Sequence, residues 1–278
     1  MGGQSALAQV LRPALASSVE VVTAGRSGCD VELDLSWPAE RLRVPIDDID
    51  VVINTAASFV DGAFESLLEA EHVNAIGALK LSHAAREAGA RHFVQVSSIN
   101  TLLDSSSDFY GAYAVSKLHA DELVWLYCAR AKMACTIVRP SQLYGELDGF
   151  RRHQPFIYGT LDKVLRGENI VIYGSRDARR NYMHVDDLSR ILVAVILGRI
   201  EGIFSCTSPA DTSLSDVANA LVRAASSSSS VSFDPTKDDI ADNVFPYDDT
   251  LYRLAGVHPK IDLQDGMTRL VTSRLPTR

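Results

Sequence analysis

Short runs of β-branched and apolar residues alternate with amphipathic stretches along the first two-thirds of the chain. The apolar runs predict four buried strands, at Val19–Thr23, Asp50–Asn54, His92–Val96 and Cys135–Val138. Stretches with helical periodicity lie between them, at Ser5–Ala16, His72–Ala88 and Tyr113–Ala131. Continuous apolar strands separated by helices are typical of a parallel sheet covered on both faces. Right-handed connections then give a doubly wound α/β fold of the Rossmann type.

The pattern changes after about Gly145. The stretch Glu146–Tyr158 is rich in charged and aromatic residues and predicts a loop. A helix, a strand and a second helix are predicted after it, at Thr160–Arg166, Ile170–Tyr173 and Val185–Gly198. We therefore expect an α/β domain over residues 1–145 and mainly a smaller lobe over 146–278, with some segments returning to the first domain. Such a lobe would close over the carboxyl ends of the strands, where open α/β sheets bind ligands.

The start of the chain departs from the usual order of this fold. A dinucleotide-binding domain begins with a strand and a glycine-rich turn that brings backbone N–H groups to the cofactor pyrophosphate. This sequence begins Met-Gly-Gly-Gln-Ser and runs directly into a predicted helix, so the usual first strand is missing. Gly2 and Ser5 fit the later small positions of the glycine turn, which makes Gly2 a candidate cofactor-binding residue. A gene start placed too late, another segment in the strand position, and a loss of cofactor binding are all compatible with this start.

The most informative motif is Tyr113-Ala-Val-Ser-Lys117, at the start of a predicted helix. Residues four apart share one helix face, so the phenol and the ammonium can approach the same ligand. A nearby ammonium lowers a tyrosine pKa, ordinarily about 10, toward the range of proton transfer at neutral pH. This spacing also occurs by chance in many helices. Ser97 and Ser98 favour the catalytic interpretation, because a hydroxyl at the carboxyl end of a strand can bond the same reacting oxygen; a helix N-cap is their alternative role.

These residues resemble the catalytic core of the extended short-chain dehydrogenases, the family of sugar-nucleotide epimerases, dehydratases and reductases. The similarity covers almost the whole chain in ordered motifs, namely Asp50-Val-Val-Ile-Asn-Thr-Ala-Ala57, Asn74-Ala-Ile-Gly77 as a helix start, Val96-Ser97-Ser98, Val138-Arg-Pro-Ser-Gln-Leu-Tyr-Gly145 and Arg180-Asn-Tyr-Met-His-Val-Asp-Asp187. The resemblance implies that Ser98 orients the substrate oxygen, that Tyr113 is the acid or base, and that Lys117 lowers the tyrosine pKa and binds the nicotinamide ribose. It also places the cofactor beside Ala56, Ala57 and Pro140.

The cofactor preference depends on residues that follow the second strand of the fold. An acidic residue there receives the ribose 2′-hydroxyl of NAD, whereas an arginine suits the 2′-phosphate of NADP. Arg26 follows the run Val19–Thr23, so the sequence favours NADP over NAD. An exposed arginine in a turn is the alternative. Asp34 and Leu35 resemble the family's acidic–leucine pair near the adenine, and Asp34 is equally compatible with a surface position.

The resemblance also places Arg180 in the second lobe, where relatives hold the diphosphate of a nucleotide-linked sugar. A guanidinium can bind phosphate oxygens with two hydrogen bonds. The alternative for Arg180 is a surface salt bridge with Asp186 or Asp187. The family usually has a second phosphate-binding arginine further on, but Asp234–Tyr247 contains none, which weakens the nucleotide-sugar assignment.

The residues after Ser98 narrow the reaction. The 4,6-dehydratases of the family carry an acidic pair there to eliminate water, whereas this chain has Ile99 and Asn100. We therefore expect epimerisation, or reduction of a 4-keto sugar, rather than dehydration.

Composition excludes several other classes. The formal charge of −8 argues against nucleic-acid binding, because such proteins usually present a basic face. No stretch resembles a signal peptide or reaches the length of a membrane span. The four cysteines lack the C-x-x-C spacing of zinc sites, so no metal is expected. The sequence predicts a soluble, cytoplasmic NAD(P)-dependent oxidoreductase, with a homodimer as the oligomer to test. A family member that binds a ligand or partner without turnover is the second hypothesis.

Overall fold

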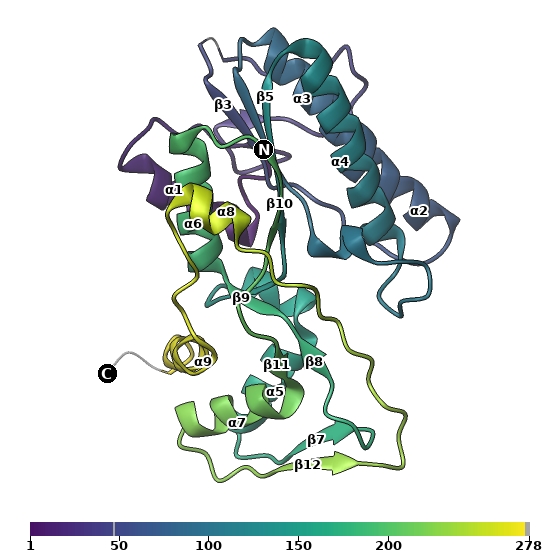
Figure 1. The fold of residues 1–278 in the computed structure, drawn as a ribbon, viewed down its shortest axis with the longest axis vertical. Helices are drawn as coiled ribbons and strands as arrows, with labels where there is room; N and C mark the ends of the chain where they lie inside the picture. Colours follow the sequence, from purple (N-terminus) through teal and green to yellow (C-terminus); the bar gives the residue numbers. More distant parts are fainter. Residues whose placement is uncertain (47, 276–278) are drawn as a thin grey trace. The chain divides into compact units, whose positions relative to one another are not determined.

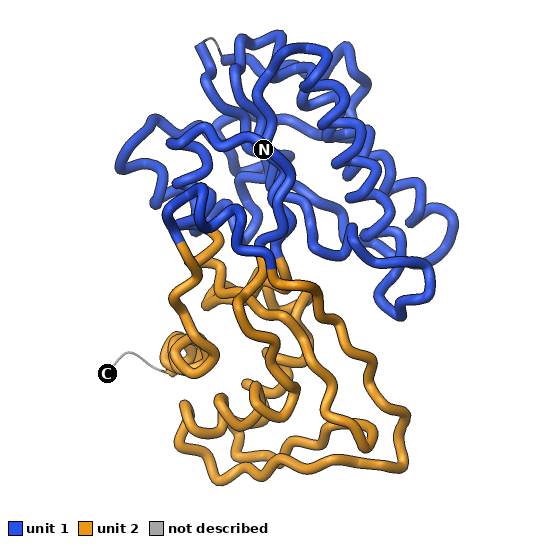
Figure 2. The backbone as a smooth tube through the Cα atoms, viewed as in Figure 1, with its two compact units in different colours: residues 1–140, 189–206, 248–257 blue, residues 141–188, 207–247, 258–278 orange. Residues whose placement is uncertain are grey.

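The computed structural model describes residues 1–46 and 48–275, which form two compact units (Figure 2). Unit 1 comprises residues 1–140, 189–206 and 248–257. Unit 2 comprises residues 141–188, 207–247 and 258–278. The chain passes repeatedly from one unit to the other, so later segments complete the first unit.

A four-stranded parallel sheet forms the centre of unit 1, in the order β10-β5-β4-β3. Its strands are β3 (Val51–Asn54), β4 (His92–Val96), β5 (Ala134–Pro140) and β10 (Gly202–Cys206). All residues of β4 are buried, because β4 is an interior strand of a sheet that helices cover on both faces (Figure 1). The predicted Rossmann-like α/β fold is confirmed. The strands predicted at residues 50–54, 92–96 and 135–138 are present with small changes in their bounds.

Helices cover both faces of this sheet. Figure 1 shows α3 (Gly77–Glu87) and α4 (Ala112–Ala131) on one side and α1 (Ala6–Ala16) and α8 (Thr250–Ala255) on the other. Small and branched residues of α4 pack against the sheet in a buried cluster that contains Ala120, Val124, Phe93 and Ile137. This packing fixes the face of α4 that is turned toward the strands. Within the described ranges, no helix combines the length and the apolar character that a membrane span needs.

The helical segment before β4 starts earlier than the sequence predicted. The expected helix His72–Ala88, with Asn74 at its start, is wrong at its N-terminus, because α2 (Phe64–Ala70), a π-helical segment (Glu71–Ile76) and α3 follow one another without a break. The large apolar side chains of α2 are exposed and give no buried periodic face, which is why the pattern missed it. Asn74 instead joins this segment to α4, since its Nδ2 donates to Ser116 Oγ at 3.0 Å.

The first residues of the chain bond to the sheet region without forming a strand. Among the described residues before α1 none lies in a strand. Even so, the Met1 nitrogen donates to Ile53 O at 2.6 Å, and Thr55 N donates to Met1 O at 3.0 Å. Gly3 N donates to Ala24 O at 3.0 Å on the other side. Residues 1–3 thus bridge the regions of β3 and β1 (Ala24–Gly25), as the carboxyl end of a strand would.

The strand predicted at Val19–Thr23 is wrong. The strand that forms is β1, which pairs in parallel with β2 (Val31–Glu32). No described strand runs alongside residues 19–22, so their backbone groups have no ladder partner, and Val19 and Val22 are exposed. A run with high β-propensity becomes a strand only where its surroundings supply pairing and burial.

Unit 2 contains three pairs of short strands, namely β6 (Gln142–Tyr144) with β9 (Tyr182–His184), β7 (Ile170–Tyr173) with β12 (Val231–Asp234), and β8 (Arg179–Arg180) with β11 (Thr212–Ser213). Its helices are α5 (Pro155–Leu165), α7 (Leu214–Ala224) and α9 (Leu263–Thr272), together with the 3-10 helix η3 (Asp148–His153). The loop predicted over Glu146–Tyr158 is therefore wrong in large part. Pro155 explains the early start of α5, because its fixed φ suits the first helical turn.

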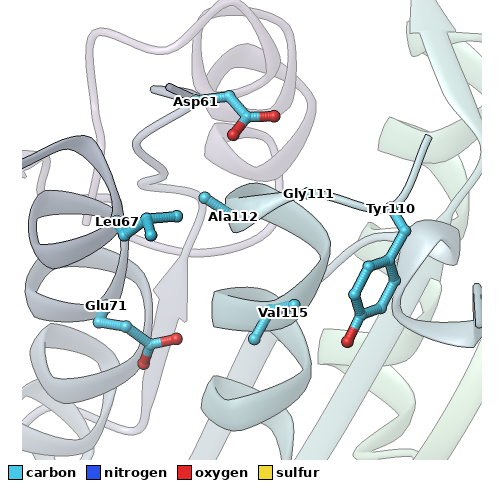
Figure 3. Close-up of a pocket in the computed structure, with 7 residues that line it drawn as sticks. All are labelled: Asp61, Leu67, Glu71, Tyr110, Gly111, Ala112 and Val115. Atoms are coloured by element: carbon cyan, nitrogen blue, oxygen red, sulfur yellow. The ribbon is translucent and has the colours of Figure 1, made fainter. Parts of the chain in front are cut away.

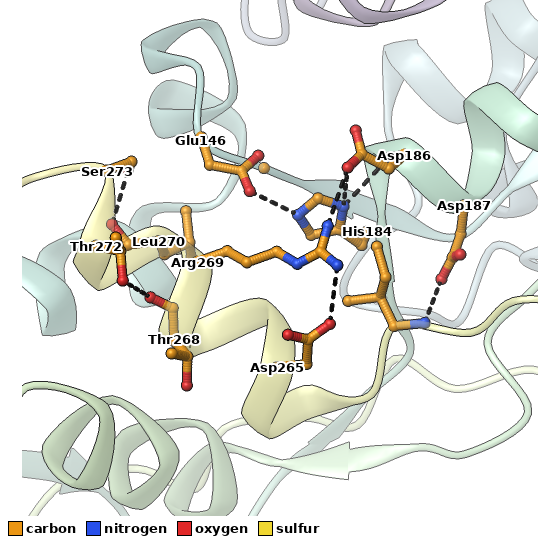
Figure 4. A network of polar contacts seen from close by, with 12 residues as sticks. Glu146, His184, Asp186, Asp187, Asp265, Thr268, Arg269, Leu270, Thr272 and Ser273 are labelled. Carbon is orange, nitrogen blue, oxygen red and sulfur yellow. Dashed lines mark hydrogen bonds and ion pairs between the residues drawn. The ribbon is translucent and has the colours of Figure 1, made fainter. Parts of the chain in front are cut away.

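A network of charged side chains around His184 ties α9 to the rest of unit 2 (Figure 4). Arg269 on α9 contacts Asp186 at 3.2 Å and Asp265 at 3.1 Å. His184 is fully buried, and its Nε2 lies 3.3 Å from Glu146 Oε1. This contact holds the pKa of Glu146 below its usual value. The network gives Asp186 and His184 structural roles within unit 2.

Candidate active site

The predicted site residues of unit 1 follow the carboxyl ends of the parallel strands. Ala56 and Ala57 come shortly after β3, Ser98 follows β4, and Pro140 is the last residue of β5. Because β3, β4 and β5 are parallel, these residues lie at one edge of the sheet. This is the edge at which open α/β sheets bind ligands.

The N-terminal turn approaches the same edge. Gly2 has a φ of +80°, and a β-carbon there would lie 2.7 Å from the backbone nitrogen of Ala56. Ser5 caps α1 by accepting a hydrogen bond from Ala8 N, and its Oγ lies 3.0 Å from Thr55 Oγ1. The turn and the first N–H groups of α1 therefore lie against the end of β3, with no side chain at Gly2 between them. This turn and the start of α1 together form a phosphate cradle. The cradle fits the pyrophosphate of a dinucleotide, because backbone N–H groups at a helix N-terminus bind phosphate oxygens.

The residues expected at the adenosine end differ in their surroundings. Arg26 follows β1 directly and is exposed. Asp34 accepts a hydrogen bond from Ser36 N at 2.9 Å, which forms a local turn. Leu35 is buried and packs closely on α3, where a β-carbon at Gly77 would lie only 2.8 Å from Leu35 Cβ. Arg26 is thus the most exposed of the three.

Tyr113 lies in the first turn of α4, and its hydroxyl lies close enough to the Ser98 side chain for that side chain to lower the Tyr113 pKa. Ser98 Oγ also accepts a hydrogen bond from Asn100 N at 3.2 Å and so caps the 3-10 helix η2 (Ile99–Leu102). The N-cap role that the sequence offered as an alternative is therefore present beside the contact with Tyr113. The structure brings together the two hydroxyls that a reacting oxygen would need.

The pKa of Tyr113 has moved in the opposite direction to that expected. Burial raises it to about 12, and the Ser98 side chain offsets only part of this rise. The loss of water around the phenol has the largest effect on this pKa, and the nearby Asp121 carboxylate also raises it, so a lowering by the Lys117 ammonium stays a prediction.

Lys117 lies almost completely buried, with 1% of its surface exposed. Its ammonium donates a hydrogen bond to the carbonyl oxygen of Val96 at 2.7 Å. Burial lowers the pKa of Lys117 to about 8, while the Asp121 carboxylate raises it. Lys117 is therefore held beneath the strand end that carries Ser98, and not on the solvent side of α4.

Two charged residues beside this site were missed by the sequence analysis. Asp121 lies four residues after Lys117 on α4 and is buried, and its Oδ2 accepts a hydrogen bond from Arg139 Nε of β5 at 2.8 Å. The available signal was spacing, because residues 113, 117 and 121 continue one helix face. A carboxylate on the buried face of a helix indicates a charged partner there.

Arg180 belongs to unit 2 and is 7% exposed. Its guanidinium donates to the carbonyl oxygens of Arg179 at 2.9 Å and Ala241 at 2.5 Å. Asp187 accepts backbone hydrogen bonds from residues 260 and 261, and Asp186 forms salt bridges with His184 and Arg269. The structure therefore gives Arg180 a buried setting in place of the surface salt bridge that was its alternative.

Two polar residues, one on each paired segment, flank Arg180 within unit 2. Thr212 pairs with Arg180 across an antiparallel ladder, and Asn243 pairs with it through a parallel bridge. Paired residues of adjacent strands point to the same face. Asn243 is 3% exposed, yet neither its Nδ2 nor its Oδ1 has a hydrogen-bond partner among the described residues. A buried carboxamide without a partner in the chain indicates a water molecule or a ligand. The sequence missed Asn243 because only an arginine was sought there.

A pocket of about 410 Å³ lies beside the first turn of α4 (Figure 3). Its lining consists of Asp61, Leu67, Glu71, Tyr110, Gly111, Ala112 and Val115. Ser98, Tyr113 and Lys117 do not line it. The candidate catalytic residues therefore occupy a different face of α4 from this pocket.

The matching family model identifies the chain. The sequence belongs to the NAD dependent epimerase/dehydratase family, whose model matches residues 5–202. A dTDP-D-glucose 4,6-dehydratase from Mus musculus is 27% identical over 250 residues, covering 83% of this chain and 69% of the relative. A dTDP-glucose 4,6-dehydratase from Mycobacterium tuberculosis is 28% identical over 177 residues, covering 58% of this chain and 53% of the relative. The chain thus spans about half the length of that second relative.

Solved structures share the fold. RMD from Pseudomonas aeruginosa, complexed with NADPH, superposes with a TM-score of 0.79 at 17% identity, covering 98% of this chain and 96% of that one. The UDP-N-acetylglucosamine 4-epimerase from Bacillus cereus gives a TM-score of 0.79 at 19% identity, with the same coverage of 98% and 96%. At such identities the likeness supports the fold and not the substrate.

Proposed function

We propose that this chain is an NAD(P)-dependent enzyme that oxidises or reduces a sugar carbon of a nucleotide-linked sugar, as an epimerase or a 4-keto reductase. The observation that carries the proposal is the closeness of the Tyr113 and Ser98 side chains at the carboxyl edge of the sheet, with Lys117 buried one helical turn further on. The two hydroxyls at this edge can act on a single substrate oxygen, while the ammonium acts on the phenol.

Each residue has a distinct task in this proposal. The nicotinamide of bound NAD(P) supplies the hydride donor or acceptor. Ser98 holds the substrate oxygen by a hydrogen bond, and Tyr113 gives its proton to a keto oxygen or takes one from a hydroxyl. Lys117 stabilises the phenolate that forms when Tyr113 gives up its proton, because an ammonium favours the charged form of a neighbouring phenol.

The substrate class rests on the family and on Arg180. The family relatives are named for dTDP- and UDP-linked sugars. Arg180, Thr212 and Asn243 would supply hydrogen-bond donors to the phosphate oxygens of such a ligand. Dehydration is not proposed, although several relatives are named dehydratases, because Ile99 is an apolar buried residue and Asn100 carries no acid.

Two assays separate the proposed reactions. Epimerisation of UDP-glucose or dTDP-glucose, followed by NMR, should proceed without net consumption of cofactor. Reduction of a 4-keto sugar nucleotide should consume one NADPH for each product formed. A protein that binds NADPH but turns over none of these substrates would support the second hypothesis, a family member that binds without turnover.

The preference for NADP, the homodimer and the cytoplasmic location remain proposals. Exposed apolar side chains on α2 and α4 favour a homodimer, namely Phe64, Leu67, Leu68, Trp125 and Leu126. Light scattering during size-exclusion chromatography tests this directly. A monomeric mass for the wild-type chain at micromolar concentration would contradict the homodimer.

A further inference from the structure

A ladder of ionisable side chains runs along one face of α4. Tyr113, Lys117 and Asp121 succeed one another at intervals of four residues, which places them one turn apart on the same side of the helix. Lys117 and Asp121 are each 1% exposed. The function proposed above uses Tyr113 and Lys117, and it leaves the buried carboxylate of Asp121 without a task.

A further cation, Arg139, contacts this ladder. Arg139 on β5 contacts Asp121 at 2.8 Å, and its own side chain is 16% exposed. Ser97, directly after β4, is a polar neighbour whose side chain lowers the pKa of Asp121, although burial of the carboxyl raises that pKa by more. Val96, the last residue of β4, accepts the hydrogen bond of the Lys117 ammonium. The Cys135 thiol on β5 is a further titratable group, whose pKa is raised mainly by the neighbouring Cys128 and by burial, and to a smaller extent by Asp121.

The charge balance makes Asp121 important for Lys117. A buried ammonium loses the solvation that favours its charged form, and a nearby carboxylate restores part of this loss. Without Asp121, the Lys117 and Arg139 cations would share the interior with no anion from the ladder. Without Arg139, the Asp121 carboxylate would act on Lys117 alone. Removal of the two partners should therefore change the protonation of Lys117 in opposite directions.

We propose that Asp121 is a positioning residue for the proposed reaction, whose carboxylate keeps Lys117 protonated and held against the Val96 carbonyl beneath Tyr113. The part that concerns catalysis rests on the function proposed above. The part that concerns the charge of Lys117 does not, because it is a property of the chain alone. The competing role is a purely structural bridge that fastens α4 to β5 through Asp121 and Arg139.

The pH dependence of folding stability distinguishes these roles without any cofactor or substrate. The pKa of Lys117 is about 8 in the folded chain, and an unfolded lysine titrates at about 10.4. Between these values the unfolded chain binds more protons, so the Lys117 contribution makes the free energy of unfolding rise with pH. To isolate this contribution, the free energy of unfolding of Lys117→Met is subtracted at each pH from that of the wild type. For each further variant, the free energy of the double variant that also carries Lys117→Met is subtracted in the same way.

In Asp121→Asn, we expect the rise to begin about one pH unit lower than in the wild type, because removal of a nearby opposite charge lowers the pKa of a buried ammonium. In Arg139→Met, we expect the rise to begin at higher pH. Asp50→Asn removes an exposed ion pair with Arg91 elsewhere in unit 1 and should leave the rise in place. Opposite shifts in the two ladder variants would support the proposal. An unchanged onset in both, or a shift of both in one direction, would overturn it.

Turnover gives a second readout once a substrate is known. The alkaline limb of the kcat profile should move to lower pH in Asp121→Asn and return in Asp121→Glu. If the chain turns over no substrate, the stability series still decides the claim about Lys117. If Asp121→Asn does not fold, Arg139→Met and Asp121→Glu decide it: an upward shift in Arg139→Met with a wild-type onset in Asp121→Glu supports the proposal, and any other result overturns it.

Discussion

The phenol ring of Tyr113 stacks on the ring of Phe59, with the ring centroids 4.6 Å apart and an angle of 18° between the ring planes. Phe59 lies in the loop after β3 and is 46% exposed, whereas Tyr113 lies in the first turn of α4. The contact restricts the orientation of the phenol, whose hydroxyl lies beside the Ser98 side chain. A loop residue that no motif indicated therefore helps to set the position of the candidate acid or base.

Replacement of Phe59 should lower turnover without unfolding the chain. Aromatic pairs contribute about 0.5–1.5 kcal/mol beyond area burial, so loss of the stack in Phe59→Ala should reduce kcat by about two- to tenfold. Phe59→Tyr keeps the ring and should behave as the wild type. Steady-state kinetics on both variants test this. Equal kcat values for Phe59→Ala and the wild type would show that the stack does not orient Tyr113.

Cofactor binding should depend on the close approach of Gly2. Its φ is +80°, and a β-carbon added there would lie 2.7 Å from Ala56 N, which leaves no room for a side chain. Gly2→Ala should therefore weaken NADH and NADPH alike, because it displaces the turn that lies at the phosphate cradle. Gly89 is a matched control, since it has a φ of +86° with nothing within 4 Å of its β-carbon position. If Gly89→Ala weakens the cofactor as much as Gly2→Ala does, backbone strain and not the cradle explains the effect.

The exposed Arg26 should make NADPH bind at least as tightly as NADH. Hydrogen bonds to charged groups contribute about 1.5–3 kcal/mol, so Arg26→Ala should weaken NADPH by about tenfold or more and leave NADH unaffected. Fluorescence titration of both cofactors measures this. A preference for NADH that persists in Arg26→Ala would contradict the assignment.

Arg180 should act on substrate binding and not on the chemical step. A phosphate contact remote from the reacting carbon stabilises ground and transition states alike, so Arg180→Ala should raise KM more than it lowers kcat. Arg166→Ala is a control, because Arg166 forms an exposed ion pair with Glu168 in the same unit. Circular dichroism must show that the buried Arg180 can be removed without unfolding. An unchanged KM would make Arg180 a structural residue.

The sequence predicted those parts of the fold that depend on local pattern. The strands β4 and β7 and the helix α6 (Val185–Gly198) have the predicted bounds, because an apolar run or an amphipathic period marks each of them. The predictions failed where contacts with distant segments determine whether a strand or helix forms. Residues 19–22 have strand propensity but no ladder partner among the described strands, and α2 forms although its large apolar side chains remain exposed.

The candidate site shows the same division. The sequence was enough to place Ser98 and Tyr113 close together. Ser98 comes just after the end of β4, and Tyr113 lies at the start of α4. The sequence could not give the direction of the Tyr113 pKa, since that direction depends on how deeply the folded chain buries the phenol. The sequence also could not identify Asp121 and Asn243, because both are notable for their buried surroundings, which distant segments of the chain form together.

The central claim is that Tyr113 transfers the proton, and turnover of Tyr113→Phe tests it most directly. This variant keeps the ring and its stack on Phe59 and removes the titratable hydroxyl, so folding should survive with a loss of about 1 kcal/mol. The account predicts a folded protein by circular dichroism whose kcat is lower by roughly two to four orders of magnitude, the usual contribution of general acid–base catalysis. A folded Tyr113→Phe protein with turnover close to that of the wild type would contradict it.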